Sequence, residues 1–546
     1  MIFEKVTPES VGIHSEGILA FLDSMEKRGL ETHSMMLIRH GKICAEGWWK
    51  PYNPDSPHMM FSFTKALAST AIGFACKEGK LALSDRICDI FPDKLPENPS
   101  ENLLSCTIYD LLTMTCGQKT ELDTSDTQNP YWIEDFFSLE FKYKPGTCFM
   151  YNTAGTNLLC AALKRRTGEN LTEYLTPRLF RPLGIANVEC FCLPDGTEAG
   201  GAGSRLKTED MARFILFVLQ NGSFGGKQLL SSDWFKTATG KLTQTVSPAY
   251  DSGDPDWRQG YGFQFWRCVP ENVFRADGAF GQYGIVFEDK DAILILQSAS
   301  SHQQEQLSVV WKELLPAITD KDVLPTSPAS LILKQRLENS EITPMLSARN
   351  PWSENRINGK RFEFCDPVPG MVDFIGGVWM VPPQGGTAKA LRFEFTKEKA
   401  DLIFEQTGGE LTSAIGLQSH FTSFTLGGRT YGAVGRWRSE NRFEAEIHCA
   451  ESIAGRRFIF TFTDDILTVE SESTLPLSGG IADRPYQRYV LKKAEYSPSR
   501  LFQSVLKDVY RIFCFVTEFY KMPALLFKKA TQSLSLSRSK FFKASE

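Results

Sequence analysis

Apolar side chains recur at two different spacings along the first 315 residues of the chain. A spacing of three and four residues predicts helices over 17–25, 62–78, 109–115, 155–167 and 210–220. Apolar runs predict a hairpin of two strands over 34–38 and 43–48, and further strands over 274–287 and 292–298. This mixture indicates an α+β domain over residues 1–320, built around an antiparallel sheet.

The pattern changes after residue 320. Residues 321–350 contain three prolines and many small polar side chains, which predicts a linker over 321–355 that is helical in part. From 356 to 495, period-two alternation such as Phe-Glu-Ala-Glu-Ile dominates, and Gly, Asp and Asn turns separate the runs. We therefore expect a second, all-β domain over 356–495, which is a small closed barrel or a sandwich.

Residues 496–546 form a basic tail. Ser497 and Pro498 are a typical N-cap and first-turn pair, and apolar residues then recur at helical spacing. From Arg500 onward there are nine Lys or Arg against three Asp or Glu, and charged residues with Pro523 break any run that could span a bilayer. Two interpretations stay open: an amphipathic helix on an anionic membrane surface, or a helix of 497–546 that docks on the chain or on a second copy. The second is favoured, and the oligomeric state is not determined by the sequence.

Composition narrows the class of protein. The 546 residues are 42% hydrophobic and 23% charged with a net charge of −5, which is typical of globular domains and gives no reason to expect a nucleic-acid partner. The opening MIFEKVTPESVG has acids and a proline where a signal peptide needs an apolar run. The thirteen cysteines are scattered and contain no C-x-x-C pair, so we expect mostly buried free thiols and a cytoplasmic protein.

The pattern Ser-x-x-Lys occurs five times, and its context separates the copies. Ser537 lies in the basic tail and Ser504 on the amphipathic segment, while Ser24 ends a short surface helix and Ser204 follows a glycine-rich turn. Only Ser62 follows an apolar run, 59–61, and opens a long apolar helix, 66–75. Ser62 is therefore the candidate nucleophile.

The chemistry of a nucleophilic serine requires this placement. Residues i and i+3 share one face of a helix, so Lys65 would lie over the hydroxyl of Ser62. Burial disfavours a charged amine and lowers its pKa, which would allow Lys65 to accept the serine proton. The alternative interpretation is a helix cap followed by a surface lysine, and this stretch alone does not decide between them.

The segment KPGTCFMYNTAGTNLL decides in favour of catalysis. Here the chain resembles the serine beta-lactamase and penicillin-binding-protein family, in particular the branch with class C beta-lactamases, esterases and D-aminopeptidases. Three ordered motifs carry the resemblance: Ser62-Phe63-Thr64-Lys65, Tyr151-Asn152-Thr153 after a Pro-Gly-Thr turn, and Ala276-Asp277-Gly278. The resemblance covers about residues 1–315 and implies the family's transpeptidase-like fold, an antiparallel sheet flanked by helices with a helical subdomain.

The resemblance also implies roles for these residues. Ser62 would attack a carbonyl and form an acyl-enzyme, with Lys65 and Tyr151 as general base and general acid. The backbone N–H groups of Ser62 and Ala279 would form the oxyanion hole. The expected substrate-binding residues are Thr153, Ala276, Asp277 and Gly278. A tyrosine can act in this way if positive charge lowers its pKa. Neither a metal nor a cofactor is expected, and the partner is a small ester or amide.

Two departures from the family pattern bear on the substrate. Thr153 stands where many class C enzymes have asparagine, and the third motif lacks the Lys or His that binds a substrate carboxylate. Arg275 could replace this cation, although it lies one position early and could point to the other face of the strand. Asp277 could favour an amine-bearing substrate or could be solvated. An esterase, amidase or D-amino-acid peptidase is thus favoured over an efficient beta-lactamase.

Three further hypotheses stay open. The chain could be a non-catalytic or weakly active penicillin-binding-like protein that serves ligand binding, although it retains all three catalytic residue types. The all-β domain could instead be the functional module. Finally, a group of large aromatic side chains could line an acyl pocket or could belong to the core: Trp48, Trp49, Trp132 and Tyr261.

Overall fold

The computed structural model describes residues 3–124, 128–342, 348–376, 385–453, 455–474 and 487–493. The chain divides into two units, 1–491 and 492–546, and almost all of the second lies outside the described residues. The hypotheses on the basic tail, and on Ser504 and Ser537, therefore lie outside the described residues. Within the described part, no helix is both long enough and apolar enough to cross a bilayer.

A six-stranded antiparallel sheet forms the centre of the first domain, in the order β2-β1-β11-β10-β9-β8. The hairpin predicted near the N-terminus is confirmed as β1 and β2, with Leu37 opposite Ala45. The strands of this sheet are β1 Thr32–Arg39, β2 Lys42–Trp48, β8 Trp266–Arg267, β9 Val273–Gly278, β10 Gln282–Phe287 and β11 Ala292–Ser298.

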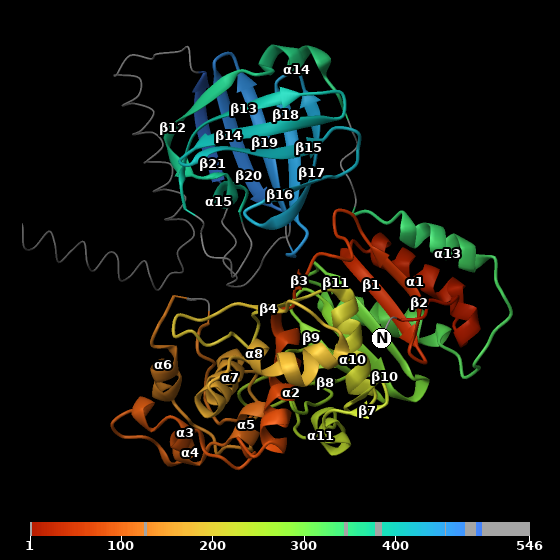
Figure 1. Cartoon of the computed structure of the whole chain (residues 1–546), viewed down its shortest axis with the longest axis vertical. Coiled ribbons are helices and arrows are strands. Elements are labelled where there is room, and N and C mark those ends of the chain that lie inside the picture. The colour runs from red at the N-terminus through yellow and green to blue at the C-terminus, as the bar shows by residue number, and fades with distance from the viewer. Residues whose placement is uncertain are drawn as a thin grey trace, which may run out of the picture. The chain divides into compact units, whose positions relative to one another are not determined.

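Both faces of this sheet are covered, which explains the uninterrupted apolar runs of its central strands. Met36 and Ile295 belong to one apolar cluster with α2 (Thr64–Lys77) and α10 (Thr208–Leu219). Their neighbours Leu37 and Leu294 belong to a second cluster with α1 (Ser15–Lys27) and α13 (Ala329–Glu338). Figure 1 shows α1 and α13 together beside β1 and β2.

The segment predicted as a strand over 274–287 folds into two strands. β9 ends at Gly278 and β10 begins at Gln282, and the two pair with each other. Phe280 and Gly281 have φ angles of 66° and 90°, so the turn uses left-handed backbone that reverses the chain within three residues. The apolar pattern runs through this turn, which is why it resembles one strand.

A group of helices packs beside the sheet and agrees with the expected helical subdomain. Its centre is α2, which contacts α7 (Thr153–Thr167), and α7 also contacts α5 (Ile108–Leu112). The side chain of Asn152 caps α7 by accepting the N–H of Gly155, and Gly168 ends it with a φ of 80°. The other helices of this domain are α3 Ile87–Ile90, α4 Glu101–Ser105, α6 Trp132–Ser138, α8 Leu171–Leu175, α9 Arg181–Leu183, α11 Ser232–Ala238 and α12 Gln303–Val309.

Two small sheets complete this domain. β3 (His58–Met59) pairs with β5 (Ser204–Leu206), which also pairs with β4 (Glu189–Cys190). β6 (Ser223–Phe224) pairs with β7 (Lys227–Gln228). The first of these sheets is relevant to the site because β3 leads directly into the candidate nucleophile.

The second domain is a closed barrel, which decides between the two predicted architectures. Consecutive antiparallel strands form the sheet, and a parallel pairing of Gly416 with Val434 joins β15 to β17, so that β16 is left beside the closed ring. The helices α14 (Pro351–Ile357) and α15 (Met371–Ile375) belong to this part of the chain. The strands are β12 Arg361–Pro369, β13 Thr387–Phe395, β14 Lys399–Gln406, β15 Gly409–Gly416, β16 Thr422–Leu426, β17 Arg429–Ser439, β18 Arg442–Cys449, β19 Gly455–Thr463, β20 Ile466–Ser473 and β21 Gln487–Lys493.

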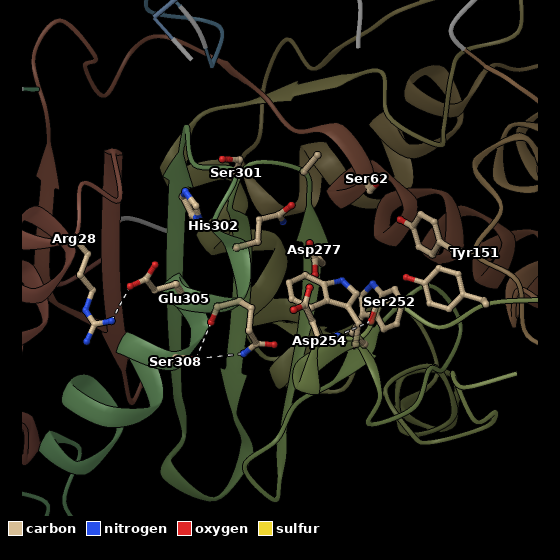
Figure 2. Close-up of a pocket in the computed structure, with 16 residues that line it drawn as sticks. Arg28, Ser62, Tyr151, Ser252, Asp254, Asp277, Ser301, His302, Glu305 and Ser308 are labelled. Carbon is tan, nitrogen blue, oxygen red and sulfur yellow. Dashed lines mark hydrogen bonds and ion pairs between the residues drawn. The ribbon is translucent and has the colours of Figure 1, made fainter. Parts of the chain in front are cut away.

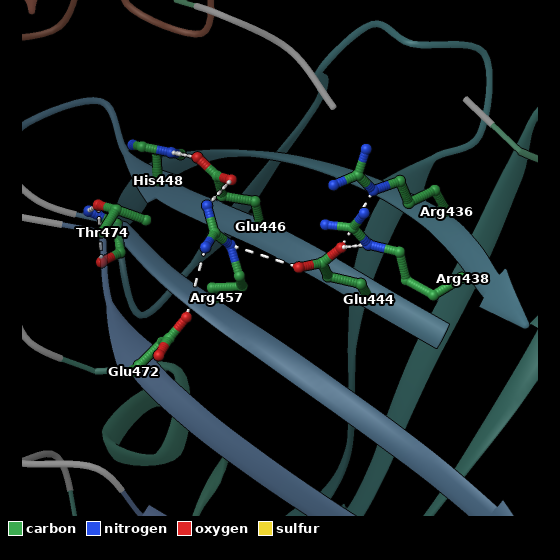
Figure 3. Close-up of polar contacts among 9 residues, drawn as sticks. Arg436, Arg438, Glu444, Glu446, His448, Arg457, Glu472 and Thr474 are labelled. Carbon is green, nitrogen blue, oxygen red and sulfur yellow. Dashed lines mark hydrogen bonds and ion pairs between the residues drawn. The ribbon is translucent and has the colours of Figure 1, made fainter. Parts of the chain in front are cut away.

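Alternation along the barrel strands separates an aromatic interior from a charged exterior. Phe443 belongs to the apolar core, whereas its neighbour Glu444 accepts hydrogen bonds from Arg436 and Arg438. Figure 3 shows how this network continues across the strands to Arg457. Burial acts to raise the pKa of the Glu444 carboxyl, but the bonds from the two arginines outweigh it, so the pKa is lowered.

The cysteines agree with the expectation of free thiols. The twelve cysteines in the described part of the chain are free, and eight of them are buried. The buried thiols are of the kind that pack as small apolar side chains.

Phe393 offers a test of the barrel core. Its ring centroid lies 5.0 Å from that of Phe460 and 5.7 Å from that of Phe443. We expect Phe393→Ala to lower the free energy of unfolding by about 3–5 kcal/mol, because it removes buried apolar contacts and leaves a cavity. Urea denaturation checks this, with Leu331→Ala at a position that is 62% exposed as the control. Equal midpoints for the two variants would contradict the assigned core.

Candidate active site

Ser62 lies on a strained turn that precedes the long helix α2. It is the middle residue of a 3-10 turn, Phe61–Phe63, and α2 begins at Thr64. Phe61 has a φ of 47°, a left-handed conformation that is rare for a bulky side chain and is typically found at functional sites. The fold thus holds the nucleophile in a fixed place on a backbone that would not adopt this shape by itself.

The ring partner of Phe61 is Phe280, which lies next to Ala279, the other residue predicted to form the oxyanion hole. The ring of Phe61 packs edge to face on that of Phe280, with centroids 5.3 Å apart. Phe280 follows Ala279, and it also has a left-handed φ, of 66°. Ser62 and Ala279 both line the same pocket. Neither phenylalanine was predicted as part of the site, because a positive φ leaves no mark in a pattern of apolar residues.

Lys65 is buried against Ser62, so the interpretation of Lys65 as a surface lysine is wrong. Its residue exposure is 1%. Its Nζ donates to Ser62 Oγ at 3.0 Å, to Thr153 Oγ1 at 3.3 Å and to the carbonyl oxygen of Gly201 at 2.6 Å. The three N–H donors of the ammonium are thus used by three acceptors from different segments of the chain.

The surroundings of Lys65 prepare it to accept a proton. Burial lowers the pKa of Lys65 to about 7, and the carboxylates of Glu121 and Asp277 act in the opposite direction. Glu121 also accepts the N–H of Thr153 at the start of α7. Near neutral pH a large fraction of Lys65 is therefore an uncharged amine, next to the hydroxyl that has to be deprotonated.

A glycine turn and an asparagine hold the carbonyl that binds Lys65. Asn157 Oδ1 accepts the N–H of Gly201 at 2.8 Å. A Cβ on Gly201 would lie 2.7 Å from Cγ2 of Thr153, so only glycine fits here. The glycine-rich segment 200–203 is thus a tight turn beside the site, as expected. Asn157 was not predicted, although it lies one helical turn after Thr153 on α7.

Tyr151 stands beside both residues within a group of aromatic rings. Its ring stacks on that of Trp266 with a centroid distance of 5.6 Å, and Lys65 Nζ lies 4.9 Å from its centroid. Burial raises the pKa of Tyr151 well above its usual value, and a hydrogen bond with Ser62 opposes this only in part. The condition that positive charge lowers this pKa is therefore not met, and the phenol is protonated near neutral pH.

Ser62 lines a pocket of about 700 Å³. Figure 2 shows Ser62 and Tyr151 at one end, Asp277 in the middle, and Arg28 with Glu305 at the other end. The residues that line it are Arg28, Ser62, Tyr151, Tyr250, Ser252, Asp254, Trp257, Trp266, Asp277, Ala279, Ser301, His302, Gln303, Gln304, Glu305 and Ser308.

The third motif presents one of its three side chains to this pocket. Asp277 lines the pocket, whereas Ala276 is fully buried in the apolar core on the other face of β9. The prediction that Ala276 contacts the substrate is wrong for its side chain, because neighbouring residues of a strand point to opposite faces. Gly278 is needed for close packing, since a Cβ there would lie 2.2 Å from the carbonyl oxygen of Met60.

Arg275 does not replace the missing cation. It points to the same face as Asp277, and its Nε donates to Asp277 Oδ2 at 2.8 Å. The guanidinium is fully buried below the pocket. Thr153, also expected to bind substrate, contacts Lys65 and is not one of the residues that line the pocket.

The aromatic residues proposed for an acyl pocket are also different from those observed. Trp48, Trp49, Trp132 and Tyr261 do not line the pocket described here, and Tyr261 packs behind Tyr151 with ring centroids 6.4 Å apart. Tyr250, Trp257 and Trp266 line it instead. These three lie in a region of loops and short strands where the sequence shows no periodic pattern.

A buried Ser-Lys pair beside a tyrosine, on an antiparallel sheet with a helical subdomain, defines a class of serine hydrolases. Comparison with known proteins specifies the family. The model of the Beta-lactamase family matches residues 20–314, which is more than half of the chain. The chain therefore belongs to the Beta-lactamase family.

Individual relatives are distant. A 6-aminohexanoate-dimer hydrolase from Paenarthrobacter ureafaciens is 23% identical over 284 residues, which cover 48% of this chain and 71% of that protein. Protein flp from Staphylococcus aureus (strain MW2) is 25% identical over 177 residues, covering 29% of this chain and 34% of that protein. The structure of an octameric penicillin-binding protein homologue from Pyrococcus abyssi covers 87% of this chain and 99% of its own, with a TM-score of 0.46 and 14% identity.

The pKa of Lys65 predicts how the reactivity of Ser62 depends on pH. Below about 7 the amine is protonated and unable to accept the serine proton, so the rate of labelling by a fluorophosphonate should rise about tenfold per pH unit and level off above about 7. Intact-protein mass spectrometry over a pH series checks this. Lys65→Ala should react slowly at every pH, and a flat profile for the unmodified protein would contradict the role of Lys65 as base.

Proposed function

We propose that this protein is an acyl hydrolase that forms an acyl-enzyme on Ser62 and hydrolyses an ester or amide. The observation that carries the proposal is the 3.0 Å contact between Ser62 Oγ and the buried amine of Lys65. This amine has a pKa of about 7, which suits a general base that works near neutral pH.

Acylation follows from these positions. Neutral Lys65 takes the proton of Ser62 as Oγ bonds to the carbonyl carbon of the substrate. The oxyanion that develops accepts hydrogen bonds from the N–H groups of Ser62 and Ala279. Tyr151, which is protonated, then donates to the leaving group as its bond to the carbonyl carbon breaks, and it regains a proton from the ammonium of Lys65.

Deacylation uses the same groups in reverse. Water replaces the leaving group in the pocket, gives a proton to the Lys65–Tyr151 pair and attacks the acyl carbon. Ser62 regains its proton when the acid leaves. The contacts of Lys65 with Ser62, Thr153 and Gly201 hold the amine in place through both half-reactions, whether it is neutral or protonated.

The pocket argues against efficient hydrolysis of beta-lactams. Such substrates carry a carboxylate, and the cation that binds it in the family is missing from the third motif. Ala276 is buried in the core, and Arg275 is engaged by Asp277. An ester, an amide or a D-amino-acid peptide without this carboxylate requirement fits the site better. The named activity of the relative from Paenarthrobacter ureafaciens, which is a hydrolase, supports the same class.

A covalent label tests the nucleophile. We expect one fluorophosphonate adduct on the protein and turnover of short-chain p-nitrophenyl esters, and Ser62→Ala should lose both because it removes the hydroxyl that contacts the Lys65 amine. Ser24→Ala is the matched control, since Ser24 begins another Ser-x-x-Lys sequence on α1 and should keep both. A folded protein with neither adduct nor turnover would favour the alternative of a non-catalytic, ligand-binding member of the family.

Tyr151→Phe tests the role of Tyr151 as proton donor while Ser62 stays in place. The variant keeps the ring that stacks on Trp266 and removes the hydroxyl. Turnover of an amide or ester should fall by about 10²–10⁴, because the leaving group no longer receives a proton. Steady-state kinetics with p-nitrophenyl acetate and with an anilide measure this, and the anilide, which has the poorer leaving group, should lose more. An unchanged kcat for the anilide would exclude Tyr151 as the acid.

A further inference from the structure

We propose that Asp277 and the aromatic side chains beside it bind a protonated amine, so that the substrate of this hydrolase carries an alkylammonium group. The aromatic wall is formed by Tyr151, Tyr250, Trp257 and Trp266, all of which line the pocket. The proposal names the substrate class of the active-site pocket and, for turnover, rests on the proposed function.

The first observation is a carboxylate oxygen of Asp277 that can still accept a hydrogen bond. Its side chain is 7% exposed, and this exposure is to the pocket that it lines. One oxygen, Oδ2, accepts the hydrogen bond of Arg275. Within the described residues no hydrogen bond occupies Oδ1, so a nearly buried carboxylate oxygen is left for a ligand. An unsatisfied oxygen in such a place is costly unless a donor reaches it.

The charge below the pocket is the second observation. Arg275 lies between two carboxylates: its Nε bonds to Asp277, and Asp256 also acts on it electrostatically. Asp256 is fully buried, and its carboxylate accepts hydrogen bonds from neutral donors on Val269, Gln304 and Trp311. With Lys65 uncharged above its pKa of about 7 and Asp277 ionised, one guanidinium against two carboxylates leaves one net negative charge. In a region shielded from water this charge attracts a cation strongly.

The aromatic wall is the third observation. The faces of aromatic rings carry partial negative charge and attract ammonium groups, most strongly at tryptophan. Two of these rings already contact a cation of the protein itself. Arg275 Cζ lies 4.5 Å from the Trp257 centroid and 5.8 Å from the Trp266 centroid. Asp254 adds a carboxylate at the exposed rim of the same wall.

The far end of the pocket offers no free cation to a substrate carboxylate. Arg28 lines this end, and its Nη1 donates to Glu305 at 2.7 Å. The two charges cancel there. The electrostatic preference of the pocket therefore comes from its middle, between the aromatic wall and Ser62, and it selects a positive group.

Inhibition of the unmodified protein by simple ions tests the preference. Hydrolysis of p-nitrophenyl acetate is measured at pH 8 with n-butylammonium, n-butanol or butyrate as the inhibitor. We expect n-butylammonium to compete at a concentration at least tenfold lower than the other two. Equal inhibition by the three compounds, or tighter inhibition by butyrate, would overturn the proposal.

Variants test which carboxylates produce the preference for n-butylammonium. Asp277→Asn should remove most of the tenfold advantage of n-butylammonium, and Asp254→Asn should remove a smaller part. Asp233→Asn is the charge-matched control, because Asp233 is 87% exposed on α11, and it should keep the full advantage. If Asp277→Asn fails to fold because Arg275 loses its partner, the double variant R275Q/D277N removes the pair together and is measured instead. An advantage that survives the loss of Asp277 would overturn the proposal.

Binding without turnover separates this proposal from the proposed function. Calorimetry of n-butylammonium with Ser62→Ala requires no catalysis, and n-butanol serves as the neutral reference. Selective binding of the ammonium would support the amine site even if ester turnover were absent. Turnover and fluorophosphonate labelling without any selective binding would leave the hydrolase in place and overturn the amine site.

Discussion

The ammonium group of Lys65 is the constraint on which the active site depends. A buried amine has to satisfy its N–H donors, and this one does so through Ser62, Thr153 and Gly201. These acceptors come from a 3-10 turn, from the start of α7 and from a glycine turn held by Asn157. The helical subdomain and the sheet have to pack correctly before the pKa of Lys65 is lowered, because burial is the cause of this shift.

The residues of β9 remove a binding site for a substrate anion and place a carboxylate in the pocket instead. Alternation places Arg275 and Asp277 on the pocket side and Ala276 in the core. The guanidinium that could have bound an anion is consumed by Asp277, which itself faces the pocket. Removing only one partner of a buried ion pair is costly, because it leaves the other charge uncompensated. The carboxylate and the guanidinium therefore act as one unit.

In both domains, the faces of a strand that are buried determine which of its positions are apolar. The sheet of the first domain has helices on one face and on the other, so its central strands β1 and β11 are buried at every position. The barrel strands have an aromatic interior and a charged exterior, so Phe443 and Glu444 alternate. Each pattern is local, and each was therefore visible in the sequence.

The candidate site was predictable where local geometry or ordered motifs determine it. Ser62 and Lys65 are three residues apart, so one turn of backbone brings them together, and Tyr151 stands at a recognisable motif before α7. The same holds for the hairpin of β1 and β2 and for the helices α7 and α10. These features depend on contacts between residues that are near one another along the chain.

The amino-acid sequence alone thus predicted the fold class, the kind of strand in each domain, and the candidate nucleophile Ser62 with Lys65 beside it. Tertiary structure alone decided which residues surround them. Trp257 and Asp254 reach the pocket from a loop with no periodic pattern, and Phe61 meets Phe280 across more than two hundred residues. The pKa of Tyr151 is raised rather than lowered because burial outweighs its hydrogen bond. Burial and long-range contact are properties of the packed chain, and no local pattern of residues encodes them.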